Sequence, residues 1–386
     1  MWRAIASNAL TILVVGLFLV GGLILWGQTQ YQSEGPLEAA ICLRVESGSN
    51  MTRVSRELED QGAITNATIF RMAADYTDRA QQLKAGSFLV REGASMEQII
   101  YEITSSGAST CGSEIEYRIG VTRAQTRVRE LNPATLEFDE IAEFDMAEEE
   151  ETPAAYQEKR QEADTRYRVS LAEGVTSWQV VEALKAFEAL SGEISEIPAE
   201  GSLAPDSYDV AAGQDRNDIL KAMQDKQQLR INAAWENRQE GLPLESPEEM
   251  LILASIIEKE TGVPGERGQV ASVFVNRLNQ GMRLQTDPTV IYGVTKGQGT
   301  LGRGLRRSEL NRPTPWNTYQ IDGLPPTPIA NPGLASLEAA VAPDNTDYVF
   351  FVADGTGGHA FAKTLQEHNR NVAKWREIEA ERNSGN

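Results

Sequence analysis

The chain has few of the residues that mark several common kinds of functional site. Of its 386 residues only two are cysteine and two are histidine, and the formal net charge is −20. This acidic surplus argues against nucleic-acid binding through phosphate neutralisation. His359 and His368 are too far apart in sequence for a helical metal pair, and neither a G-x-S-x-G motif nor a P-loop occurs. We therefore expect no metal and no cofactor.

Long apolar runs are also scarce, with one exception near the N-terminus. Residues 9–26 carry no charge and, at about 1.5 Å per residue, are just long enough to cross a bilayer. The run ends in LWGQTQYQ, which lacks the small-x-small site of a cleaved signal peptide, the alternative interpretation. Because Arg3 is the nearby positive side chain, we expect a cytoplasmic tail at 1–8, a membrane anchor at 9–28 and a linker at 29–40.

The two cysteines bracket the first segment after the linker, Cys42 in ICLRV and Cys111 in CGSEIEYRI. An oxidising exterior permits a disulfide between them, and such a long loop would make it strongly stabilising. Two separate buried thiols are the alternative.

Three stretches repeat one pattern: VESGSNMTRVSREL, VREGASMEQIIYEI and LAEGVTSWQVVEAL. Each has a strand-like start, a glycine turn, a helix N-cap and an amphipathic helix. The glycines are Gly48, Gly93 and Gly174, and the caps are Asn50, Ser95 and Thr176. The first two copies, with a helix expected around 67–83 between them, form a unit at 41–112 that resembles a LysM-type sugar-binding module. A small α+β packing domain is the alternative.

The composition changes at 113–170, which we interpret as strand plus acidic insert. Residues 137–151 hold nine acidic side chains and no basic one. Such a run is typical of a solvated, flexible spacer.

The segment SPEEMLILASIIEKETG predicts a helix with defined ends. Ser246 is the expected N-cap, Pro247 takes the first helical position, and Gly262 is the expected C-cap. Apolar residues fill most of the segment, so the helix should be largely buried.

Two glutamates occupy the last turn of this helix. On a helical wheel, Glu260 falls closer to the mean direction of the apolar side chains than Glu258, and Lys259 lies nearly opposite. Burial and the negative end of the helix dipole both disfavour a charged Glu260, so its pKa should be raised, as a general acid requires. A glutamate that only braces the fold is the alternative. We expect Glu258 to pair with a basic residue.

Beyond a second buried helix at 270–278, loops rich in Pro, Gly, Asn and aromatic residues alternate with buried elements. Such loops suit a rigid cleft for a sugar polymer. Residues 171–386 therefore predict an α+β catalytic domain with a glycan cleft. His359 falls in one of these loops, where a cleft-lining role and a structural role are both open.

At this point the resemblance to a known family is specific. SIIEKETG, NRLNQGMRLQTDPTVIYG, WNTY, GLPPTPIANPG and FVADGTGGHAF resemble the signature blocks of YceG-like (MltG-type) endolytic lytic transglycosylases. The resemblance is strong from about Leu171 onward, and the anchor and the LysM-like module agree with that family's layout. It departs at LAPDSYDV, where the family often has an aromatic residue before Pro205, and at Trp316, where tyrosine is common.

The resemblance implies a site and a reaction. Glu260 would be the catalytic residue. The substrate-binding residues would be Gln285, Asp287, Tyr292, Asn317, Tyr319 and Asn331. The enzyme would sit in the bacterial inner membrane with its catalytic domain in the periplasm, and cut nascent peptidoglycan strands between MurNAc and GlcNAc. The cut would form 1,6-anhydroMurNAc ends and terminate strand elongation. Peptidoglycan synthases (penicillin-binding proteins) are implied partners.

Two other functions stay open. One is a membrane-anchored, glycan-binding scaffold of the wall-synthesis machinery that has no catalytic activity. The other is a hydrolase that uses Asp287 with water, although an aspartate before Pro288 also fits a turn.

Overall fold

The chain is a mixed α+β protein with one apolar N-terminal helix, as the sequence predicted. The computed structural model describes residues 2–105, 109–146, 152–162 and 164–384. The chain divides into two compact units. The first comprises residues 1–115, 127–143 and 151–166, and the second comprises residues 116–126, 144–150 and 167–386.

The first unit begins with α1 (Trp2–Gln32), whose stretch Thr11–Gln32 is long and apolar enough to cross a membrane. Length and composition alone support this span, and a signal sequence would meet the same test. The predicted borders between tail and anchor and between anchor and linker both lie within this one helix, so the backbone does not change conformation at either of them.

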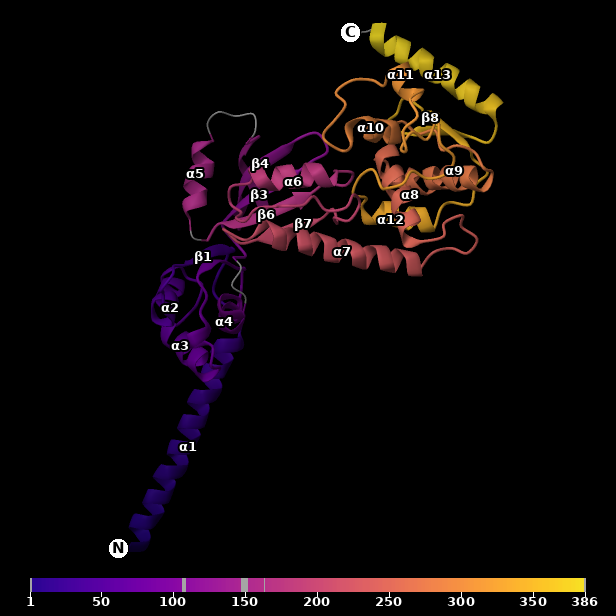
Figure 1. Cartoon of the computed structure of the whole chain (residues 1–386). Helices are drawn as coiled ribbons and strands as arrows, with labels where there is room; N and C mark the ends of the chain where they lie inside the picture. The colour runs from indigo at the N-terminus through magenta and orange to yellow at the C-terminus, as the bar shows by residue number, and fades with distance from the viewer. Residues whose placement is uncertain (1, 106–108, 147–151, 163, 385–386) are drawn as a thin grey trace. The chain divides into compact units, whose positions relative to one another are not determined.

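A small module follows α1. Its elements are β1 (Ile41–Val45), α2 (Met51–Asp60), α3 (Ala67–Tyr76), a 3-10 turn (Ala80–Gln82), β2 (Gly86–Val90) and α4 (Met96–Ser105). β1 and β2 pair antiparallel, and the three helices gather around a core that includes Leu43, Phe70 and Phe88 (Figure 1). The helix predicted around 67–83 ends early, because the chain turns at Asp78, whose φ is 56°.

The disulfide that the sequence left open is present, and the glycine turns and helix caps predicted for the three repeats are confirmed. Cys42 and Cys111 form a disulfide, with Cα atoms 5.6 Å apart. The three repeat glycines, Gly48, Gly93 and Gly174, have φ values of 81°, 63° and 78°. The three caps, Asn50, Ser95 and Thr176, each accept a hydrogen bond from the backbone N–H three residues on.

Five strands form the main sheet in the order β5-β4-β3-β6-β7. They are β3 (Ser113–Ile119), β4 (Ala124–Asn132), β5 (Glu137–Phe144), β6 (Arg166–Leu171) and β7 (Ser207–Val210), and α5 (Ala154–Gln161) precedes β6. The prediction of a flexible acidic spacer is wrong for 137–144, which is the edge strand β5. Two of its acids share a cationic partner, since Arg127 Nε lies 2.7 Å from Glu143 Oε2 and 3.6 Å from Glu140 Oε2. Residues 147–151 lie outside the described residues.

The second unit is mainly helical. Its further elements are α6 (Ser177–Ala186), α7 (Arg216–Glu236), α8 (Pro247–Glu260), a 3-10 turn (Pro264–Glu266), α9 (Arg267–Asn279), α10 (Asp287–Thr295), α11 (Arg307–Leu310), α12 (Leu334–Val341), β8 (Phe350–Ala353), β9 (His359–Ala362) and α13 (Leu365–Ser384). α8 packs against α7, α9, α10 and α12 (Figure 1). The fully buried Leu253, Ile256 and Ile257 of α8 therefore lie in the core of this unit.

Candidate active site

The site is built on the C-terminal end of α8. The predicted start of this helix is confirmed, because Ser246 caps it through a hydrogen bond from Glu249 N–H and Pro247 is its first residue. The predicted C-cap at Gly262 is wrong. The helix ends at Glu260 because Thr261 is already extended, with φ −139°, and its hydroxyl accepts from Val263 N–H. Glu260 is thus the last helical residue, where the dipole is negative.

Threonines from a distant loop meet the Glu260 carboxyl. The Thr286 hydroxyl donates to Glu260 Oε1. Thr286 is held by Thr318, whose hydroxyl accepts from Thr286 N–H at 3.0 Å, and by Thr289, which donates to Thr286 O at 2.8 Å. All three threonines are buried, so the hydroxyl that faces Glu260 has a fixed position.

The surroundings raise the pKa of Glu260, as the helical-wheel argument predicted. Burial is the main cause, and the negative charge of Asp287 adds to it. The hydrogen bond from Thr286 and the nearby His359 and Arg277 act in the opposite direction without cancelling the effect of burial. Glu260 as a whole stays partly exposed. The raised pKa favours the protonated carboxyl more than in a free glutamate, and part of the residue remains exposed.

Arg277 of α9 is fixed beside this carboxyl. Its Nε donates to Val349 O at 2.7 Å and its Nη1 to Leu284 O at 2.6 Å. Burial lowers its pKa, although an arginine remains charged at neutral pH. Arg277 therefore supplies a fixed positive charge near Glu260.

His359 forms a pair with Glu266. Its backbone N–H donates to Glu266 Oε1 at 2.9 Å, and its Nδ1 lies 2.8 Å from Glu266 Oε2. A carboxylate at Nδ1 favours a proton on that nitrogen. His359 thus has a structural role as the first residue of β9, and a positive charge on its ring would lower the pKa of Glu260, whereas a cleft-lining role stays a prediction.

Of the six predicted binding residues, three lie near Glu260. Tyr319 donates its phenol O–H to Asp287 Oδ1 at 2.7 Å. The charge of Asp287 acts on Glu260, and the charge of Glu260 acts in turn on Tyr319. The pKa of Tyr319 is raised, first by burial and then by Asp287, so its proton stays in place. Gln285 is exposed and next to Thr286, with a left-handed φ of 48° and its N–H donated to Thr318 O at 3.2 Å.

Tyr292 is directed elsewhere. Its hydroxyl donates to Glu200 Oε2 at 3.1 Å, and its ring lies 5.8 Å from that of Trp316. It lines a cavity of about 330 Å³ together with Lys259 and Pro288, the sequence neighbours of Glu260 and Asp287. Tyr292 therefore lines a neighbouring cavity, and its contact with a substrate stays a prediction.

Asn317 and Asn331 are both fully buried. The Asn317 amide donates to the backbone carbonyls of Glu309 and Leu310 in α11 and of Arg312 just after it, of which Arg312 O is nearest at 2.7 Å. Asn331 accepts from Leu203 N–H at 2.9 Å and donates to Val175 O at 2.9 Å. Buried carbonyls need donors, and these asparagines supply them. Both residues hold loops in place, and their contact with a substrate stays a prediction.

The other residues of the last turn of α8 are more buried than the helical wheel indicated. Glu258 accepts from Gly333 N–H at 2.9 Å and lies 3.6 Å from Arg267, so the predicted basic partner is confirmed. The helical wheel placed Lys259 nearly opposite the apolar side chains, yet its Nζ donates to Gly174 O at 3.1 Å, and burial lowers its pKa. Loops cover this end of α8 on more than one side.

The sequence reasoning missed Thr286, Arg277 and the partner of His359. Thr286 stands between Gln285 and Asp287, which were both predicted to bind substrate, so that sequence block did indicate the right segment of the chain. Arg277 and Glu266 carried no local signal, because their roles depend on contacts with distant segments. Within the described residues, no three His, Cys, Asp or Glu side chains are grouped so as to hold a metal ion.

The fold and this site define a mixed α+β protein with one protonatable carboxyl at the end of a buried helix. Residues 43–132 and 139–374 match the YceG-like family, and the chain belongs to that family.

Named relatives agree with this assignment. The chain is 29% identical to the endolytic murein transglycosylase of Bacillus subtilis (strain 168) over 359 residues, which cover 92% of this chain and 91% of that protein. It is 26% identical to the endolytic murein transglycosylase of Streptococcus pneumoniae serotype 2 (strain D39) over 346 residues, 86% of this chain and 58% of that protein. The crystal structure of a yceG-like protein from Listeria monocytogenes matches with 26% identity, 86% and 99% coverage and a TM-score of 0.45.

Proposed function

We propose that this protein is an endolytic lytic transglycosylase that cuts peptidoglycan strands between MurNAc and GlcNAc, with Glu260 as its acid and base. The observation that carries the proposal is the Glu260 carboxyl, whose pKa burial raises while the residue stays partly exposed. The names of the relatives supply the substrate class.

The reaction needs one proton carrier. Protonated Glu260 donates its proton to the bridging oxygen as the bond from that oxygen to C1 of MurNAc breaks. The resulting carboxylate then accepts the proton of the MurNAc C6 hydroxyl, whose oxygen bonds to C1 and closes the 1,6-anhydro ring. No water is consumed, and Glu260 is protonated again.

The neighbours of Glu260 suit both halves of this cycle. Burial and Asp287 favour the protonated form that starts the reaction. The Thr286 hydroxyl and the Arg277 charge stabilise the carboxylate that exists between the two steps. A carboxyl balanced in this way can both release and recover a proton.

A hydrolase is the second candidate, and Asp287 is the residue that favours it. It is exposed, begins α10 and has its Oδ1 held by Tyr319 at 2.7 Å. In a hydrolase, a second carboxylate activates water or attacks C1. A scaffold without catalytic activity is the third candidate. The products separate all three: anhydro ends, reducing ends or no cleavage.

The location follows from α1. We propose that Thr11–Gln32 contains a single anchor in the inner membrane, with Arg3 on the cytoplasmic side and the chain after α1 in the periplasm. Such an anchor would tether the enzyme to the membrane where new strands emerge and where peptidoglycan synthases, which we propose as partners, work. Termination of strand elongation would follow from that position.

The module at 41–112 is a second glycan contact in this proposal. Between α2, α3 and the following 3-10 turn it has a hollow of about 420 Å³, lined by polar groups that include Thr52, Thr68, Arg71 and Gln81. Hydroxyl, amide and guanidinium groups can bond sugar hydroxyls. Such a contact would hold a strand without taking part in the chemistry.

Mass spectrometry of the products tests the proposal. The full-length protein in detergent is incubated with polymeric peptidoglycan, beside Glu260→Gln and the control Glu248→Gln, which changes an exposed acid at the other end of α8. We expect internal fragments with 1,6-anhydroMurNAc ends from the wild type and the control only. Reducing ends would establish the hydrolase. Binding without cleavage by all three proteins would establish the scaffold.

A further inference from the structure

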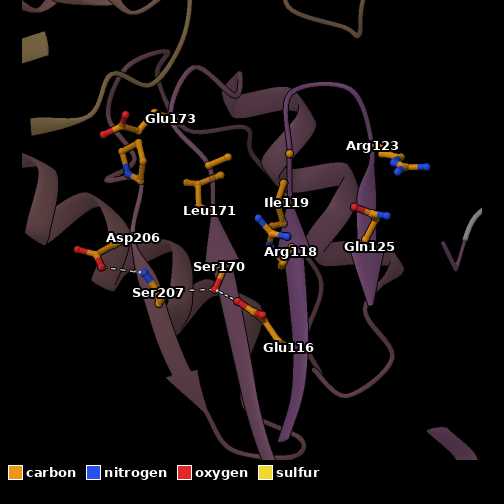
Figure 2. Close-up of a pocket in the computed structure, with 13 residues that line it drawn as sticks. Glu116, Arg118, Ile119, Arg123, Gln125, Ser170, Leu171, Glu173, Asp206 and Ser207 are labelled. Carbon is orange, nitrogen blue, oxygen red and sulfur yellow. Dashed lines mark hydrogen bonds between the residues drawn. The ribbon is translucent and has the colours of Figure 1, made fainter. Parts of the chain in front are cut away.

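A second hollow, of about 410 Å³, lies in the second unit on one face of the main sheet. Its floor is formed by alternate residues of neighbouring strands, Glu116 and Arg118 of β3, Ser170 of β6 and Ser207 of β7 (Figure 2). Nothing in the proposed reaction uses these residues. The volume is in the range of small-ligand sites.

The floor is a connected polar surface. Ser170 and Ser207 are opposite each other in the β6–β7 pair, and their hydroxyl oxygens are 2.9 Å apart. The Ser170 hydroxyl donates to Glu116 Oε1 at 2.6 Å, so Ser207 must be the donor to Ser170. These two hydroxyls supply a hydrogen bond to the buried Glu116 carboxylate, and the carboxylate in turn fixes which way each hydroxyl donates.

Arg118 differs from the rest of its strand. It is the one exposed residue of β3, and Figure 2 shows it between its own strand and Leu171 of β6. Arg123 lies at one side of the hollow in this view, and Glu173 and Asp206 lie at the other. The hollow therefore has separate positive and negative sides.

The charges on the two sides are satisfied to different degrees. Asp206 is paired with Lys226 and Arg230, and Glu173 lies 3.3 Å from Arg267. Among the described residues, Arg118 and Arg123 have neither an ion pair nor a side-chain hydrogen bond. In a chain of net charge −20, the charges that this hollow leaves available are thus positive.

These features select a ligand with both acidic and amide or amine groups. A free phosphate would suit the arginines but not the carboxylates on the opposite side. A short peptide suits both, because its carboxylates can pair with Arg118 and Arg123 while its N–H groups and any amine face Glu173 and Asp206. Burial and the neighbouring Glu258 raise the pKa of Glu173, so an added cation there would be stabilising.

We propose that this hollow binds the carboxylate-bearing stem peptide of the glycan strand that the protein cuts. The inference rests on the proposed function, since that substrate carries such peptides on its MurNAc residues. A physical connection to the catalytic helix exists. Glu173 pairs with Arg267, which lies 3.6 Å from Glu258, two residues before Glu260.

Titration tests binding independently of cleavage. A stem-type tetrapeptide is titrated into the full-length protein in detergent by calorimetry, beside its amidated form, which lacks free carboxylates, and inorganic phosphate. We expect the free peptide to bind to the wild type. The double variant Arg118→Gln, Arg123→Gln should bind it about tenfold more weakly, which is the effect of losing one charge-assisted hydrogen bond. Arg376→Gln, an exposed position on α13, is the control. Equal binding of the amidated peptide, or of phosphate, would overturn the proposal.

Kinetics then separate this inference from the proposed function. Peptide-bearing strands and strands stripped of peptide by an amidase are compared as substrates. We expect KM of the wild type to be lower on peptide-bearing strands, and the double variant to lose that difference with kcat retained. Equal KM values for the wild type would overturn the inference while leaving the transglycosylase intact. Cleavage of neither substrate would overturn the proposed function, and the titration would still decide whether the hollow binds peptide.

Discussion

The first and third copies of the repeated pattern have the same local structure and different surroundings. Gly48 and Gly174 both turn the chain with φ near 80°, 81° and 78°, and an N-capped helix follows each. Around Gly48 the space is open, whereas a Cβ on Gly174 would lie 3.5 Å from Lys259 and 3.7 Å from Glu258. One turn only closes a small core, and the other also covers the C-terminal end of α8.

The difference shows how a local motif acquires a role. The glycine turn is alike in the two copies, and Asn50 and Thr176 each cap a helix through the N–H three residues on, because both features depend on residues a few positions apart. The third copy is bound to α8 through Lys259 Nζ on Gly174 O, at 3.1 Å, and to the loop of Asn331 through Gly174 N–H, at 2.9 Å. Tertiary contacts therefore decide which copy supports a site.

The largest expected effect concerns Glu260 of α8, the helix that the third copy contacts. Glu260→Gln should reduce kcat by at least about 10³-fold, because general acid and base catalysis contributes up to 10⁴-fold and this carboxyl would serve in both roles. Rates of release of anhydro fragments measure the loss. Glu248→Gln should cut at the wild-type rate. A Glu260→Gln protein that kept a tenth of the activity would remove Glu260 from the mechanism.

The second largest effect concerns the disulfide of the module that contains the first copy, and it should not change the candidate site. Replacing Cys42 and Cys111 by serine removes a disulfide that closes 69 positions, worth roughly 4 kcal/mol in the chain-entropy model. We expect the first unit to unfold at lower denaturant concentration while cleavage by the intact protein continues. Denaturant unfolding followed by limited proteolysis gives the measurement. Unchanged stability of the first unit, or a loss of kcat in native buffer, would contradict this expectation.

Matched glycine substitutions compare the two turns directly. Gly48→Ala and Gly174→Ala each place a Cβ at a left-handed φ, at a cost of about 1 kcal/mol. Both should lower Tm to a similar extent, but Gly174→Ala should also reduce activity, because its carbonyl holds Lys259 beside Glu260. Equal activity of the two variants would mean that the contact with Lys259 is structural only.

The smallest effect is a pH-dependent difference in stability. Folding raises the pKa of Glu260. At a pH above the ordinary carboxyl pKa, the folded state therefore binds more protons than the unfolded state. The stability of the fold then falls as the pH rises through the raised pKa. Glu260→Gln should therefore have the same Tm as the wild type near pH 4 and a higher Tm, by about 2–4 °C, near pH 7.5. A constant difference across this range would argue against a raised pKa.

The parts of the fold that depend on near neighbours were predictable. The cap at Ser246, the helix through Glu260 and the three glycine turns were all read correctly, because a few adjacent residues specify each of them. The acidic strand β5 was misread from its charge, since the guanidinium of Arg127 on β4 makes that charge tolerable in a sheet.

The candidate site was predictable only in its centre. Glu260 could be selected from the helical pattern, but the hydroxyl that contacts it arrives from Thr286, 26 positions on, and the partner of His359 is 93 positions away. Asn317 and Asn331 look like surface residues because they stand in loops rich in proline. Their burial depends on carbonyls that only the folded loops bring together.

The sequence by itself determined the family, the helix that carries the acid and the apolar stretch that could anchor the chain, because each is specified by residues close together in the chain. Tertiary structure alone decided which polar groups face Glu260, which asparagines are buried and where the exposed Arg118 emerges from its sheet. The physical reason is that pKa, burial and hydrogen-bond partners depend on every segment within a few ångströms, and most of those segments are distant in sequence.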